Sequence, residues 1–202
     1  MKMNLPNKLT VLRLCLVPVI IIIGMLPNTV IPFYVSCVIC AALFIGTAVT
    51  DMLDGKIARR DGLVTDFGKF LDPVADKFMV IGTLFVILYK FPHLQTLMIF
   101  TLIIIVFREL AVTSMRLVVS TGEGIVVAAN ILGKIKTVSQ MVGTIVILVE
   151  PALPMIIQLD AVKFVADNHI LSYIAMAVMA ITTIVSGIDY LKAYMPYIDS
   201  NK

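Results

Sequence analysis

Charged residues are scarce in this sequence, and their scarcity excludes an ordinary soluble domain. Only 14% of the 202 residues are charged, 60% are hydrophobic, and the mean hydropathy is +1.03. A typical soluble domain has about 25% charged and roughly 45–50% apolar residues. The composition therefore predicts an all-α integral membrane protein that crosses the bilayer several times.

Histidine and cysteine are also rare, which narrows the chemistry that the chain can perform. The two histidines, His93 and His169, fall in connections that we expect on the opposite side of the membrane from the aspartates. That position argues against histidine acid–base chemistry and against a zinc site. Cys37-x-x-Cys40 is half a zinc motif without a second pair, so we interpret these thiols and Cys15 as small buried side chains.

Six apolar spans can be marked along the chain, which we treat as a single domain over residues 1–202. They cover approximately residues 10–26, 30–49, 71–88, 94–112, 131–149 and 170–188. A membrane-spanning helix needs ~20 residues, so the third span is long enough only if residues 72–77 are helical too. The first span lacks an Ala-x-Ala-type cleavage site, so we expect a retained helix rather than a signal peptide.

The basic residues are distributed unevenly between the two sides of this topology. Six spans place both termini on one side, together with residues 51–77 and 107–137, and this side holds every lysine and arginine except Lys90 and Lys163. The positive-inside rule then places the termini and a polar cavity in the cytoplasm of a multi-pass cell-membrane protein. The basic side suggests contact with anionic membrane lipids or a phosphate substrate, and we expect no nucleic-acid partner.

Four aspartates are regularly spaced at the end of the second span and at the start of the third. Asp51 and Asp54 are three residues apart and Asp72 and Asp76 are four apart, so each pair shares one helical face. Ionisable groups inside a membrane cost about 2.5–3.5 kcal/mol each to insert, and neighbouring carboxylates repel one another. A bound divalent cation would offset both costs, and all-oxygen ligands favour a hard ion such as Mg²⁺, Mn²⁺ or Ca²⁺.

A simpler interpretation makes such aspartates solvated charges that pair with basic neighbours such as Lys56, Arg60 and Lys69. We adopt it for Asp61 and Asp66, which are out of phase with the other four. For the four phased aspartates we favour bound cations, because carboxylate-held metals recur in phosphorus chemistry.

The segment between the two aspartate pairs suits a phosphate group. Arg59 is able to clamp a diphosphate, and the hydroxyl of Thr65 is able to donate a hydrogen bond to it. The residues alone therefore predict a cytoplasm-facing, metal-dependent site for a phosphorylated or diphosphate substrate.

The spacing of these residues resembles the signature of the CDP-alcohol phosphotransferase family. The matching pattern is Asp51-x-x-Asp54-Gly55-x-x-Ala58-Arg59, eight residues, Gly68-x-x-x-Asp72-x-x-x-Asp76. The resemblance implies six membrane helices and a homodimer. It also implies that the four aspartates hold two divalent cations, Mg²⁺ or Mn²⁺, and that Asp76 acts in addition as the general base. It further implies a CDP site lined by Gly55, Ala58, Arg59 and Thr65.

Four further segments resemble one bacterial branch of this family. They are "NLPNKLTVLRLCLVP", "FGKFLDPVADK", "FRELAVTSMR" and "GKIKTVSQ". In that branch a phosphatidyl group passes from CDP-diacylglycerol to sn-glycerol 3-phosphate, giving phosphatidylglycerophosphate and CMP. The resemblance implies the same substrates here.

A group of cations near the fourth and fifth spans fits such an acceptor. The candidates for binding its phosphate are Arg108, Arg116, Lys134 and Lys136. Arg108 and Arg116 are eight residues apart and nearly share a helical face, Glu109 is placed to orient one of them, and Lys136 faces a different direction from Lys134. The alternative is that these cations anchor the protein to lipid head groups.

Three polar residues also share one face of the first span. Asn7, Thr10 and Arg13 are each three residues apart. They either contact the nucleotide or brace the aspartate helix, and we include Asn7 and Thr10 among the CDP-binding candidates. The alternative is that Asn7 or Thr10 caps the helix while Arg13 extends to the interface.

The predicted reaction is a direct attack of the acceptor hydroxyl, because no serine, cysteine or histidine is placed to form a covalent intermediate. Three alternatives stay open. The first is the same chemistry with phosphatidylglycerol, inositol phosphate or serine as acceptor. The second is an intramembrane prenyltransferase, which usually needs more helices. The third is a divalent-cation transporter, which would need polar groups along a path across the membrane.

We have no functional interpretation of residues 151–168, which form a mildly amphipathic outer connection.

Overall fold

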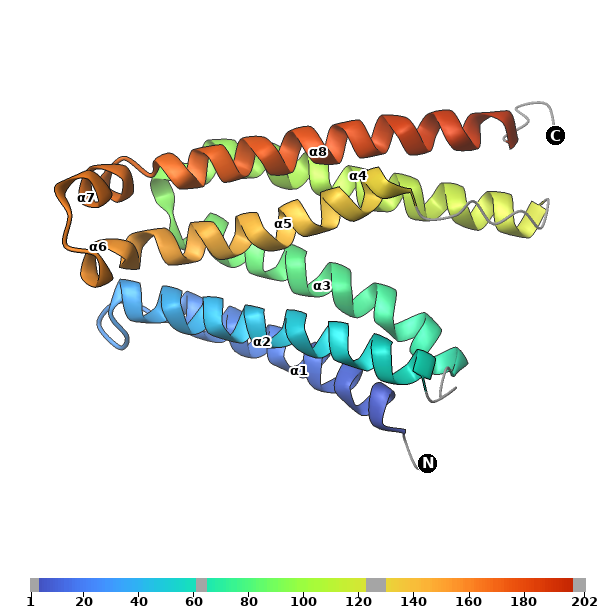
Figure 1. Ribbon diagram of the computed structural model, residues 1–202, viewed down its shortest axis with the longest axis horizontal. Helices are drawn as coiled ribbons and strands as arrows, with labels where there is room; N and C mark the ends of the chain where they lie inside the picture. The colour runs from blue at the N-terminus through green and yellow to red at the C-terminus, as the bar shows by residue number, and fades with distance from the viewer. Residues whose placement is uncertain (1–3, 61–64, 123–129, 198–202) are drawn as a thin grey trace.

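The computed structural model shows a bundle of long helices joined by short connections (Figure 1). It describes residues 4–60, 65–122 and 130–197, and these contain no strand. The long helices are α1 (Leu5–Met25), α2 (Phe33–Arg60), α3 (Asp66–Lys90), α4 (Gln95–Gly122), α5 (Ile131–Val149) and α8 (Ile170–Tyr194). The short ones are η1 (Pro92–Leu94), η2 (Glu150–Ala152), α6 (Leu153–Ile156), α7 (Asp160–Asp167) and η3 (Met195–Tyr197). The predicted all-α class is confirmed.

Five stretches of the described chain are long and apolar enough to cross a membrane. They are Leu5–Met25, Phe33–Leu53, Pro92–Val119, Ile131–Ile156 and Ile170–Tyr197. The chain is therefore a helical membrane protein, and five of the six predicted spans are confirmed by length and composition. Residues 72–77 are helical as the third span required, but the charges of Asp72, Asp76 and Lys77 interrupt the apolar character of α3.

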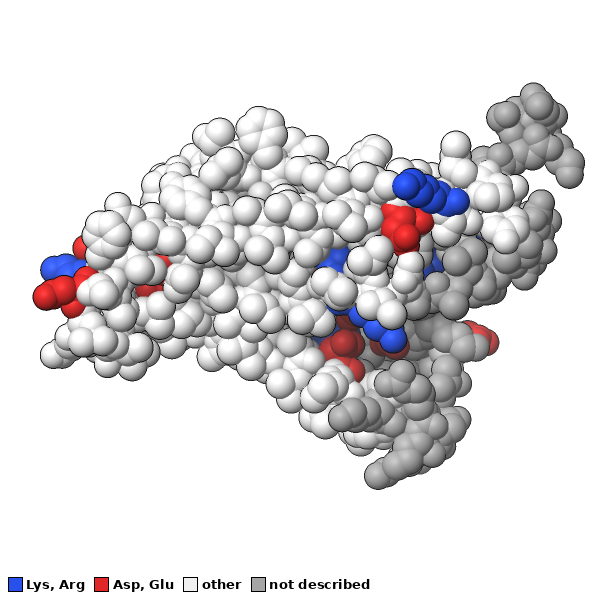
Figure 2. Space-filling model, turned by 45° about the horizontal axis from the view of Figure 1, so that its top comes forward, with Lys and Arg blue, Asp and Glu red and all other residues white. Residues whose placement is uncertain are grey.

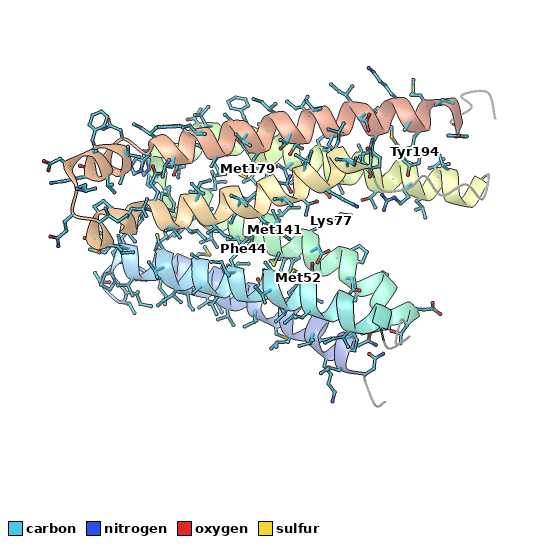
Figure 3. The ribbon with its side chains drawn as sticks, viewed as in Figure 1. Phe44, Met52, Lys77, Met141, Met179 and Tyr194 are labelled. Carbon is cyan, nitrogen blue, oxygen red and sulfur yellow. The ribbon has the colours of Figure 1, made fainter. Side chains whose placement is uncertain are left out.

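The third helix contacts long helices in both parts of the bundle. It packs against α1 on one side and against α4 and α5 on the other, while α8 packs against α4 and α5. The buried apolar core includes Met79 of α3. It also includes Phe44 of α2 and Met179 of α8, which are labelled in Figure 3. Large apolar side chains are also exposed on the outside of the long helices, as expected where lipid replaces water.

Charged groups gather at one end of the bundle. The starts of α1, α3 and α5 and the ends of α2, α4 and α8 lie at this end, and α6 and α7 lie at the other (Figure 1). On the face drawn in Figure 2, acidic and basic side chains gather in a hollow near the first end, and a wide belt without charge separates them from a smaller group at the second. The helix directions thus bring the aspartates and the candidate acceptor cations together.

The histidines lie at the end away from the aspartates, as predicted. His93 belongs to η1 and His169 precedes α8, and their rings stack with centroids 3.7 Å apart. The prediction for the cysteines was partly wrong. Cys37 and Cys40 are buried, but Cys15 lies on the exposed side of α1, where an apolar thiol can face lipid.

The close packing of α1 on α3 depends on a glycine. A methyl group at position 24 would stand 2.1 Å from Cγ1 of Val86, whereas one at position 46 would meet no atom within 4 Å. Small residues of this kind let two helices approach closely in a membrane.

We expect Gly24→Ala to destabilise the bundle and Gly46→Ala to leave its stability unchanged or slightly higher. Overpacking of a fitted interface costs about 1–3 kcal/mol, while alanine is favoured over glycine inside a helix. Thermal melts of the two variants in detergent, followed by far-ultraviolet circular dichroism, provide the test. Equal melting temperatures for both variants and the wild type would contradict the packing described.

Candidate functional site

A buried arginine of α1 connects the two aspartate-bearing helices. The side chain of Arg13 is 0% exposed, and its Nη1 atom lies 2.7 Å from Oδ1 of Asp51 in α2 and 2.7 Å from Oδ1 of Asp76 in α3. Both carboxylates remain partly accessible, with side-chain exposures of 31% and 45%. The brace predicted for Arg13 is confirmed and its extension to the interface is wrong, while a contact with the nucleotide stays a prediction.

The same face of α1 makes two more contacts with the start of α3. The hydroxyl of Thr10 donates to Oδ1 of Asp72 over 2.7 Å, and the hydroxyl of Thr65 donates to Oδ1 of Asn7 over 3.0 Å. The N-cap of α1 is Asn4, whose side chain accepts from the N–H of Asn7, so neither Asn7 nor Thr10 is the cap. The three-residue spacing on α1 therefore braces α3 at successive turns.

Thr65 has a local role beside its predicted contact with the nucleotide. It is the N-cap of α3, and its Oγ1 atom accepts a hydrogen bond of 3.1 Å from the N–H of Gly68. A methyl group on Gly68 would lie 3.0 Å from Oδ1 of Asn7, which is closer than an ordinary contact. The close approach of α1 to the start of α3 therefore favours glycine at this position. CDP binding by Asn7, Thr10 and Thr65 stays a prediction.

Other candidates occupy the last turns of α2. Gly55 follows Asp51 by one turn and is half-buried. Asp54, Ala58 and Arg59 belong to the helix, but their side chains lie outside the described part of the structure. Their predicted roles in metal and CDP binding remain predictions.

The donor set fits a hard divalent cation by its chemistry. Asp51, Asp72 and Asp76 present carboxylate oxygens from two helices that α1 holds together, and such ions prefer oxygen ligands. Among the described side chains, however, no three acidic, histidine or cysteine residues are arranged as a metal cluster. A cation site is thus compatible with the residues present.

A cavity of about 430 Å³ joins the aspartates to the predicted acceptor site. It lies between α3, α4 and α5. Its polar lining includes Asp72, Asp76, Lys77, Arg108, Glu109, Thr113, Arg116, Lys136, Thr137 and Gln140. Acidic groups of α3 and basic groups of α4 and α5 therefore face one space.

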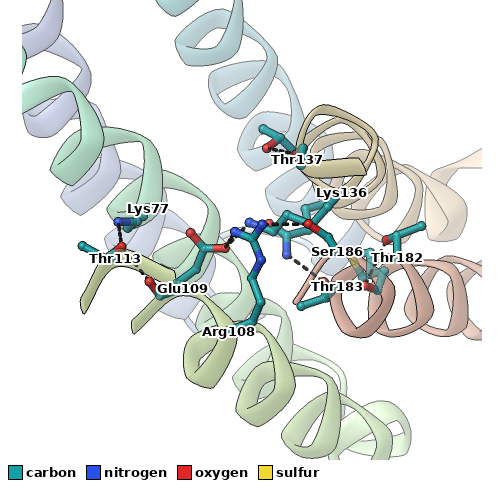
Figure 4. A network of polar contacts seen from close by, with 12 residues as sticks. Lys77, Arg108, Glu109, Thr113, Lys136, Thr137, Thr182, Thr183 and Ser186 are labelled. Atoms are coloured by element: carbon teal, nitrogen blue, oxygen red, sulfur yellow. Dashed lines mark hydrogen bonds and ion pairs between the residues drawn. The ribbon is translucent and has the colours of Figure 1, made fainter. Parts of the chain in front are cut away.

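A single carboxylate organises two of the cations in this cavity (Figure 4). Oε1 of Glu109 accepts from Nη1 of Arg108 over 3.1 Å and also from Nζ of Lys136. The other terminal nitrogen of Arg108 donates to Oγ of Ser186 over 2.7 Å, and its guanidinium lies 5.1 Å from the ring centre of Tyr190. The expectation that Glu109 orients an arginine is confirmed.

The remaining candidate cations are divided between two spaces. Arg108 and Arg116 line the cavity just described and also a second hollow between α4, α5 and α8, which confirms that they share a helical face. Lys134 lines the second hollow, whereas Lys136 faces the aspartate cavity. The two lysines do face different directions, and Lys136 is the one brought to the aspartates.

Sequence reasoning missed several polar residues at this site. Lys77, Thr113, Gln140 and Ser186 were not singled out, although all four contribute to the network or the cavity lining. Lys77 follows Asp76 directly, so its position beside the motif was the available signal. Ser186 and Gln140 lie inside predicted spans, where a polar residue within an apolar stretch was the only signal.

The sequence is similar to proteins of one known family. The sequence model of the CDP-alcohol phosphatidyltransferase family matches residues 3–186. A Bacillus subtilis protein named CDP-diacylglycerol–glycerol-3-phosphate 3-phosphatidyltransferase is 41% identical over 196 residues, which cover 93% of each chain. Proteins of the same name from Rickettsia felis and Shigella flexneri are each 34% identical over 96% of this chain. The match covers 97% of the Rickettsia protein and 96% of the Shigella protein.

Replacing Arg13 by methionine should destabilise the site, because the carboxylates of Asp51 and Asp76 would then face each other without the guanidinium. We expect the free energy of unfolding to fall by about 1–3 kcal/mol, measured by thermal melts in a buffer that contains a metal chelator. Adding Asp76→Asn to Arg13→Met should recover part of this loss, because one negative charge is removed. A single variant as stable as the wild type would contradict the role of Arg13 as a brace.

Proposed function

The chain belongs to the CDP-alcohol phosphatidyltransferase family, as its aspartate motif predicted, and we propose that it transfers a phosphatidyl group from CDP-diacylglycerol to sn-glycerol 3-phosphate. The products are phosphatidylglycerophosphate and CMP. The names of relatives that match nearly the whole chain support these substrates. The observation that carries the proposal is the cavity in which aspartates and several cations face one another.

The cations of the cavity favour an acceptor that is itself an anion. Arg108, Arg116 and Lys136 all line it, and glycerol 3-phosphate is a small dianion whose phosphate oxygens suit such donors. Serine is a zwitterion without net charge, and it offers these cations a single carboxylate in place of a dianionic phosphate. The cavity therefore supports an acceptor that carries a phosphate, and the names of the relatives favour glycerol 3-phosphate over inositol phosphate.

The aspartates supply the opposite half of the site. Asp51, Asp54, Asp72 and Asp76 would hold two divalent cations, Mg²⁺ or Mn²⁺. When bound, such ions neutralise the diphosphate of the donor and the charge that develops on departing CMP. Gly55, Ala58, Arg59, Thr65, Asn7 and Thr10 would line the neighbouring CDP site.

Asp76 is placed to act on the acceptor. It lines the cavity, Arg13 holds one of its oxygens, and almost half of its side chain is accessible. As general base it takes the proton of the primary hydroxyl of glycerol 3-phosphate. That oxygen attacks the phosphatidyl phosphorus, the bond from phosphorus to the CMP oxygen breaks, and CMP leaves with its electron pair.

The topology that we propose has six spans, with α3 as the sixth. This helix runs beside the other long helices (Figure 1), and its charged residues Asp72, Asp76 and Lys77 line the inner cavity rather than the lipid face. The basic end, with both termini and the active site, faces the cytoplasm. A homodimer within the cell membrane remains the expected assembly, and the exposed apolar side chains offer ample surface for one.

The cavity lining gives no support to a cation transporter. The apolar part of its lining includes Val80, Ile81 and Ile105, which offer no oxygen ligand to a cation. The polar groups thus stop short of the path that transport requires.

The proposed reaction is tested by CMP release from purified protein with CDP-diacylglycerol and Mg²⁺, with and without glycerol 3-phosphate. We expect release to depend on glycerol 3-phosphate and to fall at least about a hundredfold in Asp76→Asn, because the general base is lost. Asp66→Asn on the same helix is the matched control and should keep full activity. Release that prefers another alcohol would overturn the acceptor, and full activity of Asp76→Asn would overturn the base.

Removal of metal provides a separate test of the aspartates. Treatment with a chelator should abolish CMP release without loss of helicity, and Mg²⁺ or Mn²⁺ should restore it. Asp51→Asn should need a higher metal concentration for half-maximal activity, because one ligand is missing. Activity that persists in the chelator would contradict the proposed metal dependence.

A further inference from the structure

We infer that Lys77 is an additional binding residue for the acceptor, and that its ammonium group contacts the phosphate of glycerol 3-phosphate. The inference rests on the proposed function and extends it to a residue outside the predicted set. It depends on where α3 places this lysine, on its partner in α4, and on the charge balance of the cavity.

The ammonium group of Lys77 is held inside the cavity by a neutral partner. Its Nζ atom donates to Oγ1 of Thr113 over 2.7 Å, and that hydroxyl donates to the backbone oxygen of Glu109 over 2.7 Å. Figure 3 shows Lys77 pointing from α3 into the space beside α5, and Figure 4 shows its contact with Thr113 of α4. Thr113 therefore fixes the ammonium group between the two halves of the site.

Lys77 differs from the neighbouring cations in its charge compensation. Arg108 and Lys136 share the carboxylate of Glu109, so one negative charge already offsets part of theirs. Lys77 is held by a hydroxyl, which carries no charge. An ammonium group has three N–H donors, so those not used by Thr113 can bind an incoming oxygen anion.

The charge balance of the cavity calls for such a group. With Glu109 between them, Arg108 and Lys136 together present about one net positive charge, which does not match a dianion. Lys77 and the more exposed Arg116 supply the remainder from two sides of the cavity. Because a half-buried charge is screened less than an exposed one, Lys77 should contribute strongly to phosphate affinity.

The position of Lys77 also fits the shape of the acceptor. It follows Asp76 in the chain, and both side chains line the same cavity. Glycerol 3-phosphate carries its reacting hydroxyl at one end and its phosphate at the other. A phosphate held by Lys77, Arg108 and Lys136 leaves the hydroxyl end directed towards Asp76.

Steady-state kinetics with Lys77→Met test the inference, with Lys192→Met as the matched control. Lys192 is an exposed lysine of α8 near the same end of the bundle. We expect the KM for glycerol 3-phosphate to rise about ten- to a hundredfold in Lys77→Met, with the KM for CDP-diacylglycerol and kcat within about threefold. The inhibition constant of inorganic phosphate, used as a competitor of the acceptor, should rise by a similar factor. Lys77→Arg should recover part of the affinity, and the control should match the wild type.

Two further comparisons separate the possible failures. Thr113→Val removes the hydroxyl that holds Lys77 and should raise the same KM by a smaller factor, so it carries the test if Lys77→Met does not fold. A wild type that does not use glycerol 3-phosphate would refute the proposed function itself. A wild type that uses it, with an unchanged KM in the variants or a loss in kcat alone, would overturn the role of Lys77.

Discussion

One buried guanidinium holds the proposed active site together. Arg13 of α1 places a single nitrogen against carboxylates from α2 and α3, and Thr10 and Asn7 on the same face secure the start of α3. A fully buried arginine is stable only when it is paired, and the two carboxylates need a positive charge in return. This mutual requirement fixes the relative position of three helices, and the spacing of the aspartates follows from it.

A second polar group makes the other half of the cavity. Glu109 gathers Arg108 and Lys136 from adjacent helices, much as Arg13 gathers the aspartates. The cavity thus contains an acidic half centred on a cation and a basic half centred on an anion. In each half the central group offsets part of the charge around it, which lowers the cost of placing so many charges in an apolar bundle. We propose that metals and phosphate groups bind between them during the reaction.

The fold class and the family could be predicted from the sequence because both depend on local patterns. Hydropathy predicted the long helices, and the fixed spacing of Asp51, Asp54, Asp72 and Asp76 indicated the family that the comparisons confirm. Helical phase also predicted that Arg108 and Arg116 share a face. These features need no knowledge of which helix packs against which.

Contacts between distant helices could not be predicted in the same way. Phase placed Arg13 on the face of Thr10 but could not show that this face is buried against α3. Lys134 and Lys136 are alike in sequence, and only the packing of α5 against α3 and α8 selects Lys136 for the aspartate cavity. The charges within α3 obscured its apolar character, and the sequence could not show that these side chains line a cavity between helices.

The most direct test is an experimental structure of the protein in lipid with Mn²⁺ and glycerol 3-phosphate. We expect anomalous scattering from manganese beside Asp51, Asp72 and Asp76. We also expect the acceptor phosphate between Lys77, Arg108 and Lys136, with the primary hydroxyl of the acceptor directed towards Asp76. Manganese bound away from the aspartates, or a phosphate held on the lipid-facing surface instead of in the cavity, would contradict these expectations.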